Sequence, residues 1–150
     1  MIEIDLSKLT FHALQIKNDL QSARDQIVRP ILAQAAVLGY CSQDQFALRL
    51  GLEEAISNAY KHGNRCEPDR TLRVRWSMDP NVMVICIADD GEGFNPKNVP
   101  DPRVRENLEK PSGRGLMLIK AYMTELRFNE RGNEICLIKV RKRRPCRTHT

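Results

Sequence analysis

A run of seven apolar residues that ends in acids and glycines restricts the fold of this chain more than any other feature. Residues 82–89 read VMVICIAD, and residues 71–78 before them read TLRVRWSM, with Asp79, Pro80 and Asn81 between the two runs. Two β-rich runs joined by turn-forming residues predict an antiparallel hairpin. Side chains alternate between the faces of a strand, so a run that is apolar throughout must be buried on both faces. The sequence therefore predicts that residues 82–88 form the central strand of a sheet.

Further strands are predicted on both sides of this hairpin. Residues 2–6 and 11–17 read as short strands, and a final hairpin is expected over about 125–129 and 134–140, with its turn at Arg131, Gly132 and Asn133. Between the two hairpins, the stretch from Asn95 to Pro111 holds four of the eight prolines and reads as a long loop. Loops of this length inside a compact domain are usually functional.

A first helix is predicted before the 71–78 strand. Asn18 or Asp19 offers an N-cap, apolar residues recur at helical spacing after it, and Gly39 is suited to end the helix. Pro30 falls inside the pattern and lacks the N–H that a helix interior needs. We therefore expect a kink at Pro30 or two abutting helical segments.

A second helix is predicted to begin at Ser42, with Gln45 completing a capping box, and to end at Gly63. One apolar stripe along it comprises Leu48, Leu52, Ala55, Ile56 and Ala59. A neighbouring stripe starts with small residues and becomes polar, in the order Ala47, Gly51, Glu54, Asn58, His62. Such a stripe is typical of a helix that flanks a pocket.

The net charge of +5 is concentrated at the C-terminal end. Six basic residues lie there without acids, and removing them leaves 18 basic against 19 acidic residues: Lys139, Arg141, Lys142, Arg143, Arg144 and Arg147. The basicity therefore belongs to a tail, which favours a solvated tail over contact with an acidic partner or nucleic acid. A nucleic-acid binder is disfavoured further because no aromatic residues interleave with the basic run.

Cysteine usage and hydropathy indicate a cytoplasmic protein without a membrane span. The five cysteines are odd in number, scattered, and form no C-x-x-C pair, which disfavours both zinc and a disulfide framework. Cys86 and Cys136 lie in apolar runs, where we expect them reduced and acting as small hydrophobic residues. No apolar run approaches the roughly 20 residues of a membrane helix, and the N-terminal residues show no signal-peptide pattern.

The second helix carries the first of three clusters of functional residue types. Spacing of i, i+4 places Glu54 and Asn58 on one face. A carboxylate can act as a base, and an amide oxygen is a hard ligand that suits Mg²⁺. Taken alone, an acid and an amide on a helix usually face solvent, so the pair gains meaning only from two further clusters later in the chain.

The other two clusters are rich in glycine. Residues 89–94 read DDGEGF at the end of the predicted central strand, where glycines permit close backbone approach to a ligand. A carboxylate at the mouth of a buried strand needs a partner, and the exocyclic amine of adenine would provide one. Their spacing is not that of an EF-hand, which leaves a plain turn as the alternative. Gly113, Arg114 and Gly115 precede a predicted helix at 116–123, a suitable phosphate site.

The order of these clusters resembles the N, G1 and G2 boxes of the GHKL ATPase superfamily, which includes gyrase B, histidine kinases and MutL. The resemblance spans roughly Phe11 to Val140. Within the superfamily, EAISNAYKHGN, DDGEGF and GRGLMLIKAYM look most like anti-sigma-factor serine/threonine kinases. The resemblance implies an α/β two-layer sandwich with a mixed, mainly antiparallel sheet and helices on one face. We expect residues 1–140 to form this domain and 141–150 a basic tail.

The resemblance also implies the roles of individual residues. Glu54 would be the catalytic base, Asn58 would hold Mg²⁺ at the ATP phosphates, and Asp89 would bind the adenine amine. The wider nucleotide site would comprise His62, Gly91, Gly93, Phe94, Arg105, Gly113, Arg114, Gly115 and Leu116. Arg103 and Lys110 are further candidates for contact with the γ-phosphate, and spacing does not choose among these cations.

The implied function is ATP-dependent phosphorylation of a serine on a small anti-sigma-factor antagonist protein, combined with sequestration of a sigma factor. Members of this family commonly form homodimers. The alternative is a regulatory ATP-binding module that binds a protein partner without phosphotransfer. Retention of Glu54 favours the enzyme, because a pure binding module needs no base.

Overall fold

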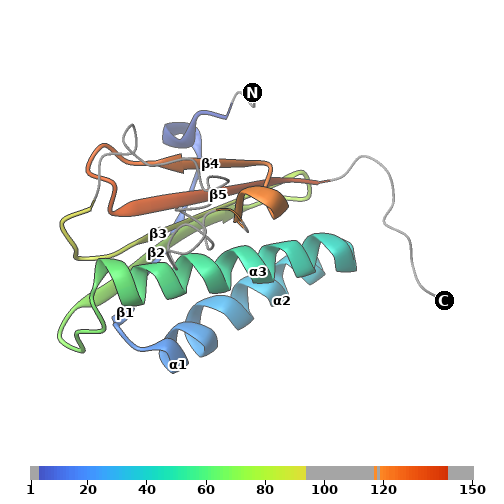
Figure 1. Ribbon diagram of the computed structural model, residues 1–150. Helices are drawn as coiled ribbons and strands as arrows, with labels where there is room; N and C mark the ends of the chain where they lie inside the picture. Colours follow the sequence, from blue (N-terminus) through green and yellow to red (C-terminus); the bar gives the residue numbers. More distant parts are fainter. Residues whose placement is uncertain (1–3, 94–116, 118, 142–150) are drawn as a thin grey trace.

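A single five-stranded sheet lies over a layer of helices (Figure 1). The computed structural model describes residues 4–93, 117 and 119–141. The strands run in the order β1-β2-β3-β5-β4, and each neighbouring pair is antiparallel. Their bounds are β1 (His12–Lys17), β2 (Thr71–Met78), β3 (Val82–Ala88), β4 (Glu125–Phe128) and β5 (Glu134–Val140). The predicted two-layer fold with a mainly antiparallel sheet is confirmed, and every pair among the described strands is antiparallel, with no parallel pair.

The predicted central position of β3 is confirmed by its burial. Residues 83–88 are all buried, and β3 lies between β2 and β5. Met83, Ile85 and Ile87 pack into the main core against the helices, whereas Val84 and Cys86 belong to a second apolar cluster on the opposite face. Continuous hydrophobicity in this strand thus reflects cover on both faces of the sheet.

The first predicted helix follows one helical path divided into three segments. These are α1 (Leu20–Ala23), the π-helical segment η2 (Arg24–Val28) and α2 (Arg29–Val37). Asp19 is the N-cap, and its carboxylate accepts a hydrogen bond from the Ser22 N–H at 2.9 Å. Pro30 lies in the first turn of α2, directly after the π segment. The expected interruption is therefore confirmed, and the wider π turn precedes a residue that cannot donate its own N–H.

The second helix, α3 (Ser42–Asn58), continues into the π-helical segment η3 (Ala59–Gly63). The predicted capping box is wrong, because Cys41 is the N-cap and no side chain caps the helix. Gln45 instead donates through Nε2 to the Tyr40 carbonyl at 2.7 Å. Residues 117 and 119–122 are also helical, while residues 94–116 and 118 lie outside the described part of the chain.

The N-terminal segment covers the face of the sheet opposite the helices. The strand predicted at 2–6 is wrong over its described residues 4–6, because Leu6–Lys8 form the 3-10 helix η1 and the Asp5 carboxylate caps it by accepting from the Ser7 N–H. A small second core results from Val84, Cys86, Cys136 and Ile138, with Ile4, Leu6, Leu9, Phe11 and Val82 packed against it. A local side-chain cap therefore overrides the alternating pattern that had suggested a strand.

Cys86 and Cys136 form a disulfide in this second core, so the expectation that both are reduced is wrong. They are directly opposite each other on β3 and β5, with Cα atoms 3.9 Å apart. The Asp89 N–H donates to the Asn133 carbonyl in the same ladder at 2.9 Å, which makes 86 and 136 a non-hydrogen-bonded pair. Side chains approach most closely in such pairs, and pairing across strands was invisible to the spacing of cysteines along the chain.

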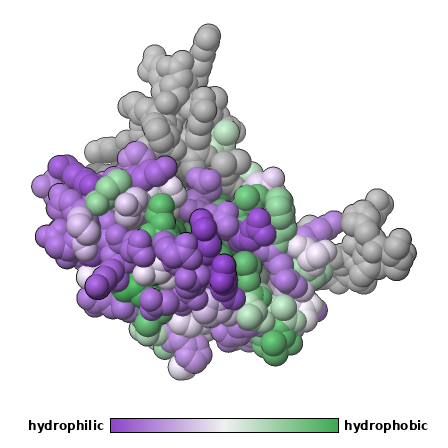
Figure 2. Space-filling model, turned by 90° about the horizontal axis from the view of Figure 1, so that it is seen from below, coloured by the Kyte–Doolittle hydropathy of each residue, from purple (hydrophilic) through white to green (hydrophobic). Residues whose placement is uncertain are grey.

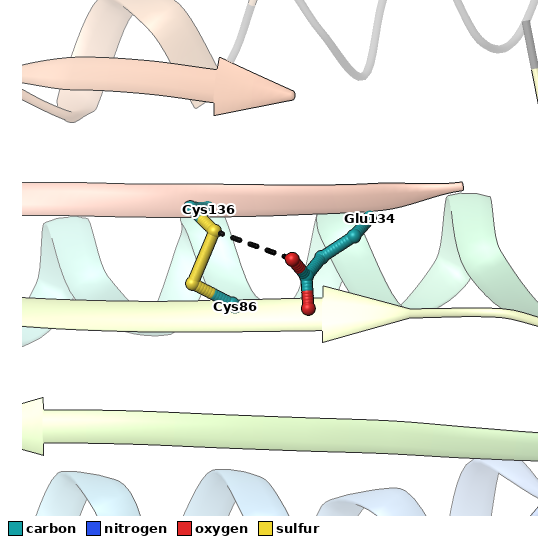
Figure 3. A group of neighbouring side chains, drawn as sticks. All are labelled: Cys86, Glu134 and Cys136. Atoms are coloured by element: carbon teal, nitrogen blue, oxygen red, sulfur yellow. Dashed lines mark hydrogen bonds between the residues drawn. A yellow bond between two sulfur atoms is a disulfide. The ribbon is translucent and has the colours of Figure 1, made fainter. Parts of the chain in front are cut away.

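Glu134 lies beside this disulfide on the same face of β5 (Figure 3). Its Oε1 is 4.0 Å from the Cys136 sulfur, a contact rather than a proton donation because a bonded sulfur carries no proton. Glu134 also forms an ion pair with Arg75 at 3.1 Å, and the Arg75 guanidinium stacks 4.6 Å above the Phe11 ring. The carboxylate is thereby held on the outer face by a cation of β2, which lies on the other side of β3.

Polar contacts tie the helical layer to the sheet at its margins. The Trp76 indole N–H of β2 donates to Gln34 Oε1 of α2 at 3.1 Å. Arg141 donates to the carbonyls of Gly39 and Pro80 at 2.6 and 3.1 Å and packs on the Tyr40 ring. Arg141, counted with the basic tail above, is thus held against the folded layers, while residues 142–150 lie outside the described part of the chain.

The outer surface of the helical layer is largely hydrophilic, with apolar side chains in separate patches (Figure 2). The large apolar residues exposed among the described ones are few: Leu20, Val37, Phe46 and Tyr122. No helix in the described ranges has the length and apolar character needed to span a membrane.

Candidate nucleotide site

The polar stripe of the second helix is placed as the sequence predicted. Ala47 and Gly51 are buried, Glu54 and Asn58 are half-buried, and His62 is exposed. Exposure therefore increases along one face of α3 and η3 toward the end that meets the sheet. Glu53, the neighbouring acid, is exposed and pairs with Arg49 at 3.6 Å. The structure thus separates the two glutamates by burial, and only Glu54 belongs to the stripe.

Asp89 lies at the end of β3, where its backbone and carboxylate are both held. The Asp89 carbonyl accepts from Arg73 Nη2 at 2.9 Å and from Asn133 Nδ2 at 3.1 Å. The Gly91 N–H donates to Asp89 Oδ1 at 2.8 Å. Among the described residues this is the one hydrogen bond to the carboxylate, which leaves Oδ2 with acceptor capacity.

Gly63, which the sequence marked only as a helix end, forms the floor beneath the Asp89 carboxylate. A Cβ on Gly63 would lie 2.0 Å from Asp89 Oδ2 and 2.5 Å from Oδ1. A Cβ on Gly91 would lie 2.3 Å from the Gly63 carbonyl oxygen. Both glycines are therefore needed for the close approach of the helix end to the strand end. The signal that could have revealed this is the pairing of K-H-G-N with D-D-G, but the approach joins residues far apart in the chain.

The pKa values of the two acids at the end of β3 are shifted in opposite directions. Burial raises the pKa of Asp89 above its usual range, and the Gly91 N–H and the charge of Arg73 offset this only in part. Burial alone would raise the pKa of Asp90, but hydrogen bonds from Thr71 and Arg73 outweigh it and lower that pKa. Asp90 is thus a structural anion paired with β2, whereas Asp89 retains unsatisfied acceptor capacity.

Gly93 has a positive φ of 79°, and a Cβ there would lie 2.0 Å from the Arg131 carbonyl oxygen. The segment after Asp89 therefore turns tightly past the β4–β5 hairpin. The remaining predicted site residues lie outside the described residues, and their assignments stay predictions: Phe94, Arg103, Arg105, Lys110, Gly113, Arg114, Gly115 and Leu116.

The residues present fit a magnesium-bound adenine nucleotide. Asp89 offers an acceptor for an amine at a spot where Gly63 and Gly91 leave no side chain in the way. Asn58 shares one half-buried helix face with Glu54 and offers an amide oxygen, the donor type that Mg²⁺ prefers. The arrangement can recognise a base at one end and hold a phosphate-bound metal ion along the helix.

The strand order and the arrangement of Glu54, Asn58 and Asp89 together define a class of nucleotide-binding domain. In this class a helix with an acid and an amide on one face ends beneath an aspartate at the end of a central strand. The chain belongs to the histidine kinase-like ATPase domains, whose family model matches residues 17–139. The predicted superfamily is thereby confirmed.

Curated relatives are similar over part of their length. The chain is 30% identical over 80 residues to an anti-sigma F factor of Halalkalibacterium halodurans, covering 51% of this chain and 53% of that protein. It is 26% identical over 98 residues to the serine-protein kinase RsbW of Oceanobacillus iheyensis, covering 61% and 62%. The chain therefore aligns with little more than half to three-fifths of these proteins.

A solved structure supports the fold. The RsbU and RsbW domains of a Mycobacterium tuberculosis protein superpose with a TM-score of 0.55 at 19% identity, covering 93% of this chain and 35% of that one. At this identity the likeness concerns the fold alone.

Proposed function

We propose that this protein is an ATP-dependent serine/threonine kinase of the anti-sigma-factor type. It phosphorylates a small antagonist protein and, when free of that antagonist, binds a sigma factor in the cytoplasm. The observation that carries the proposal is the position of the Asp89 carboxylate over Gly63, at the end of the helix that carries Glu54 and Asn58. Burial raises the pKa of this carboxyl group. Similarity to an anti-sigma F factor and to RsbW kinases supports the choice of substrate class.

Each residue has a separate task in this proposal. Asp89 accepts a hydrogen bond from the adenine amine, and Asn58 offers its amide oxygen to the metal. Glu54 accepts the proton of the attacking serine hydroxyl. Mg²⁺ supplies charge neutralisation at the phosphates. Phosphoryl transfer depends mainly on positioning and charge stabilisation, so a base, a metal ligand and an adenine acceptor are the types of group that the reaction needs.

A regulatory module that binds ATP and a partner without phosphotransfer is the second candidate. The half-burial of Glu54 beside Asn58 favours the kinase, since a binding module gains nothing from a carboxylate near the metal ligand. The two candidates differ in whether phosphate reaches a protein hydroxyl.

The test is single-turnover phosphorylation of the protein that copurifies with the chain, using labelled ATP and Mg²⁺. Glu54→Gln keeps the shape of the side chain but cannot take a proton, so transfer should fall by roughly 10²–10⁴-fold. ATP affinity should change little. Asn58→Ala should instead weaken Mg²⁺-ATP binding in calorimetry while leaving the fold intact.

Glu53→Gln is the matched control, because Glu53 is adjacent in the chain but exposed and paired with Arg49. It should retain nearly full transfer. Near-full activity in Glu54→Gln would overturn the assignment of the base. A wild type that binds ATP and its partner yet transfers no phosphate would establish the binding module instead.

A further inference from the structure

Asn64, the residue after Gly63, is completely buried, and both polar atoms of its side-chain amide form hydrogen bonds. Its Nδ2 donates to Asn18 Oδ1 at 2.9 Å and to the Thr71 carbonyl at 2.8 Å. Its Oδ1 accepts from the Asp90 N–H at 2.8 Å. These three hydrogen bonds connect Asn64 to the residue after β1, to the first residue of β2 and to the second residue after β3. Among the described side chains, no other joins these three strands in this way.

The chemistry of these partners requires an asparagine. Two acceptors face its Nδ2 and one donor faces its Oδ1, so a flipped amide would meet like groups on every side. A carboxylate would offer no donor to Asn18 or Thr71. The side chain therefore has one orientation and one suitable residue type.

The hydrogen bond from the Asp90 N–H to Asn64 holds the peptide that directly follows Asp89, the proposed adenine acceptor. The peptide between Asp89 and Asp90 has its carbonyl held by Arg73 and Asn133, and its N–H held by Asn64. When both polar ends of a peptide are fixed, its plane is fixed, and the backbone from which the Asp89 side chain projects is fixed with it. Asn64 is also bonded in the chain to Gly63, so one residue positions both the floor and the carboxylate above it.

We propose that Asn64 is a positioning residue for base recognition, which sets the preference of the site for adenine by holding Asp89 in register with Gly63. The proposal rests on the ATP site of the proposed function. It adds that the strength of the amine–carboxylate hydrogen bond depends on an amide that does not itself touch the nucleotide. Loss of Asn64 leaves the carboxylate present but releases the N–H end of the peptide that follows it.

The experiment compares the binding of ATP with that of inosine triphosphate, which lacks the exocyclic amine, by calorimetry in Mg²⁺. The wild type should prefer ATP by roughly 10- to 100-fold, as expected for one hydrogen bond to a charged group. Asn64→Ala should weaken ATP binding and leave inosine triphosphate nearly unchanged, so that the preference falls to about 3-fold or less. Partial unfolding lowers both affinities equally, so the ratio reports positioning rather than stability.

Asp79→Ala is the matched control. Asp79 Oδ1 accepts from the N–H groups of Asn81 and Val82 at 2.7 and 2.9 Å, at the end of β3 remote from Asp89. Its loss should lower stability and keep the wild-type ratio. Where Asn64→Ala yields no folded protein, Asn64→Ser provides the same comparison with less volume removed.

The outcomes separate this inference from the proposed function. A wild-type ratio in the Asn64 variants, or equal loss of both nucleotides, would overturn it and leave the kinase untouched. A wild type that prefers ATP, loses the preference in Asn64→Ala, and transfers no phosphate would support the inference and overturn the kinase. A wild type that binds neither nucleotide, or both alike, overturns the inference.

Discussion

Asp89 combines recognition with a cost to the folded state. Its pKa is raised mainly because the carboxylate is partly removed from water, and one N–H donor offsets this only in part. A folded-state pKa above the unfolded value means that the stability present at low pH is lost as pH rises through the folded pKa. At neutral pH the ionised carboxylate therefore opposes folding until a donor such as an amine pairs with it.

Asp89→Asn should accordingly raise the melting temperature of the nucleotide-free protein near neutral pH by about 1–4 °C. The gain should shrink as pH falls through the raised pKa of Asp89, because the wild-type carboxyl group is then protonated as well. Thermal unfolding across pH measures this, and added ATP should stabilise the wild type but not the variant. A lower melting temperature at all pH values would contradict the cause assigned to the pKa shift.

Local patterns predicted most elements, whereas contacts across the chain decided the exceptions. Strand-like runs and turn residues located β1, β2, β3, β4 and β5, because the periods of strands and helices can be recognised from neighbouring residues. The same reasoning placed Glu54 and Asn58 on one face. It missed the 3-10 helix of the N-terminal segment, the order of the described strands in the sheet and the structural role of Asn64. The sheet order and the role of Asn64 depend on partners tens of residues away, and the 3-10 helix packs under strands equally distant in the chain.

Gly63→Ala tests the contact between a helix end and a strand end. Its Cβ would lie 2.0 Å from Asp89 Oδ2, so we expect the carboxylate to be displaced and ATP affinity to fall by about 10-fold or more. Gly51→Ala is the control on the same helix, since its Cβ would meet the flexible end of Met123 at 3.0 Å. That variant should keep ATP affinity, with calorimetry as the measurement. Equal ATP affinity in both variants would rule out the floor described for Gly63.

At the scale of the whole molecule, the sheet is covered on both faces by unequal layers. Helices cover one face, and the N-terminal segment with the second core covers the other. The Cys86–Cys136 disulfide crosses β3 and β5 within the thinner cover. The central strands are thereby joined covalently where the least apolar material surrounds them.

Replacing both cysteines by alanine should lower the free energy of unfolding by about 2–4 kcal/mol, because the disulfide closes a separation of 50 residues in the unfolded chain. Denaturant unfolding without reductant is the measurement. Cys66→Ala is the control, since Cys66 is exposed and free, and it should leave stability unchanged. Alkylation of Cys86 and Cys136 in the unfolded, unreduced wild type would show that the bond is absent.

The contact between Trp76 and Gln34 gives the protein an internal optical reporter. The chain contains one tryptophan, and its indole bridges β2 and α2, with the His12 ring centroid 5.5 Å from its own. Intrinsic emission therefore arises from a single place, the seam between the sheet and α2. A spectral shift on adding a partner protein reports movement of α2. A constant spectrum during nucleotide titration shows that the contact between α2 and the sheet is kept while nucleotide binds at the end of β3.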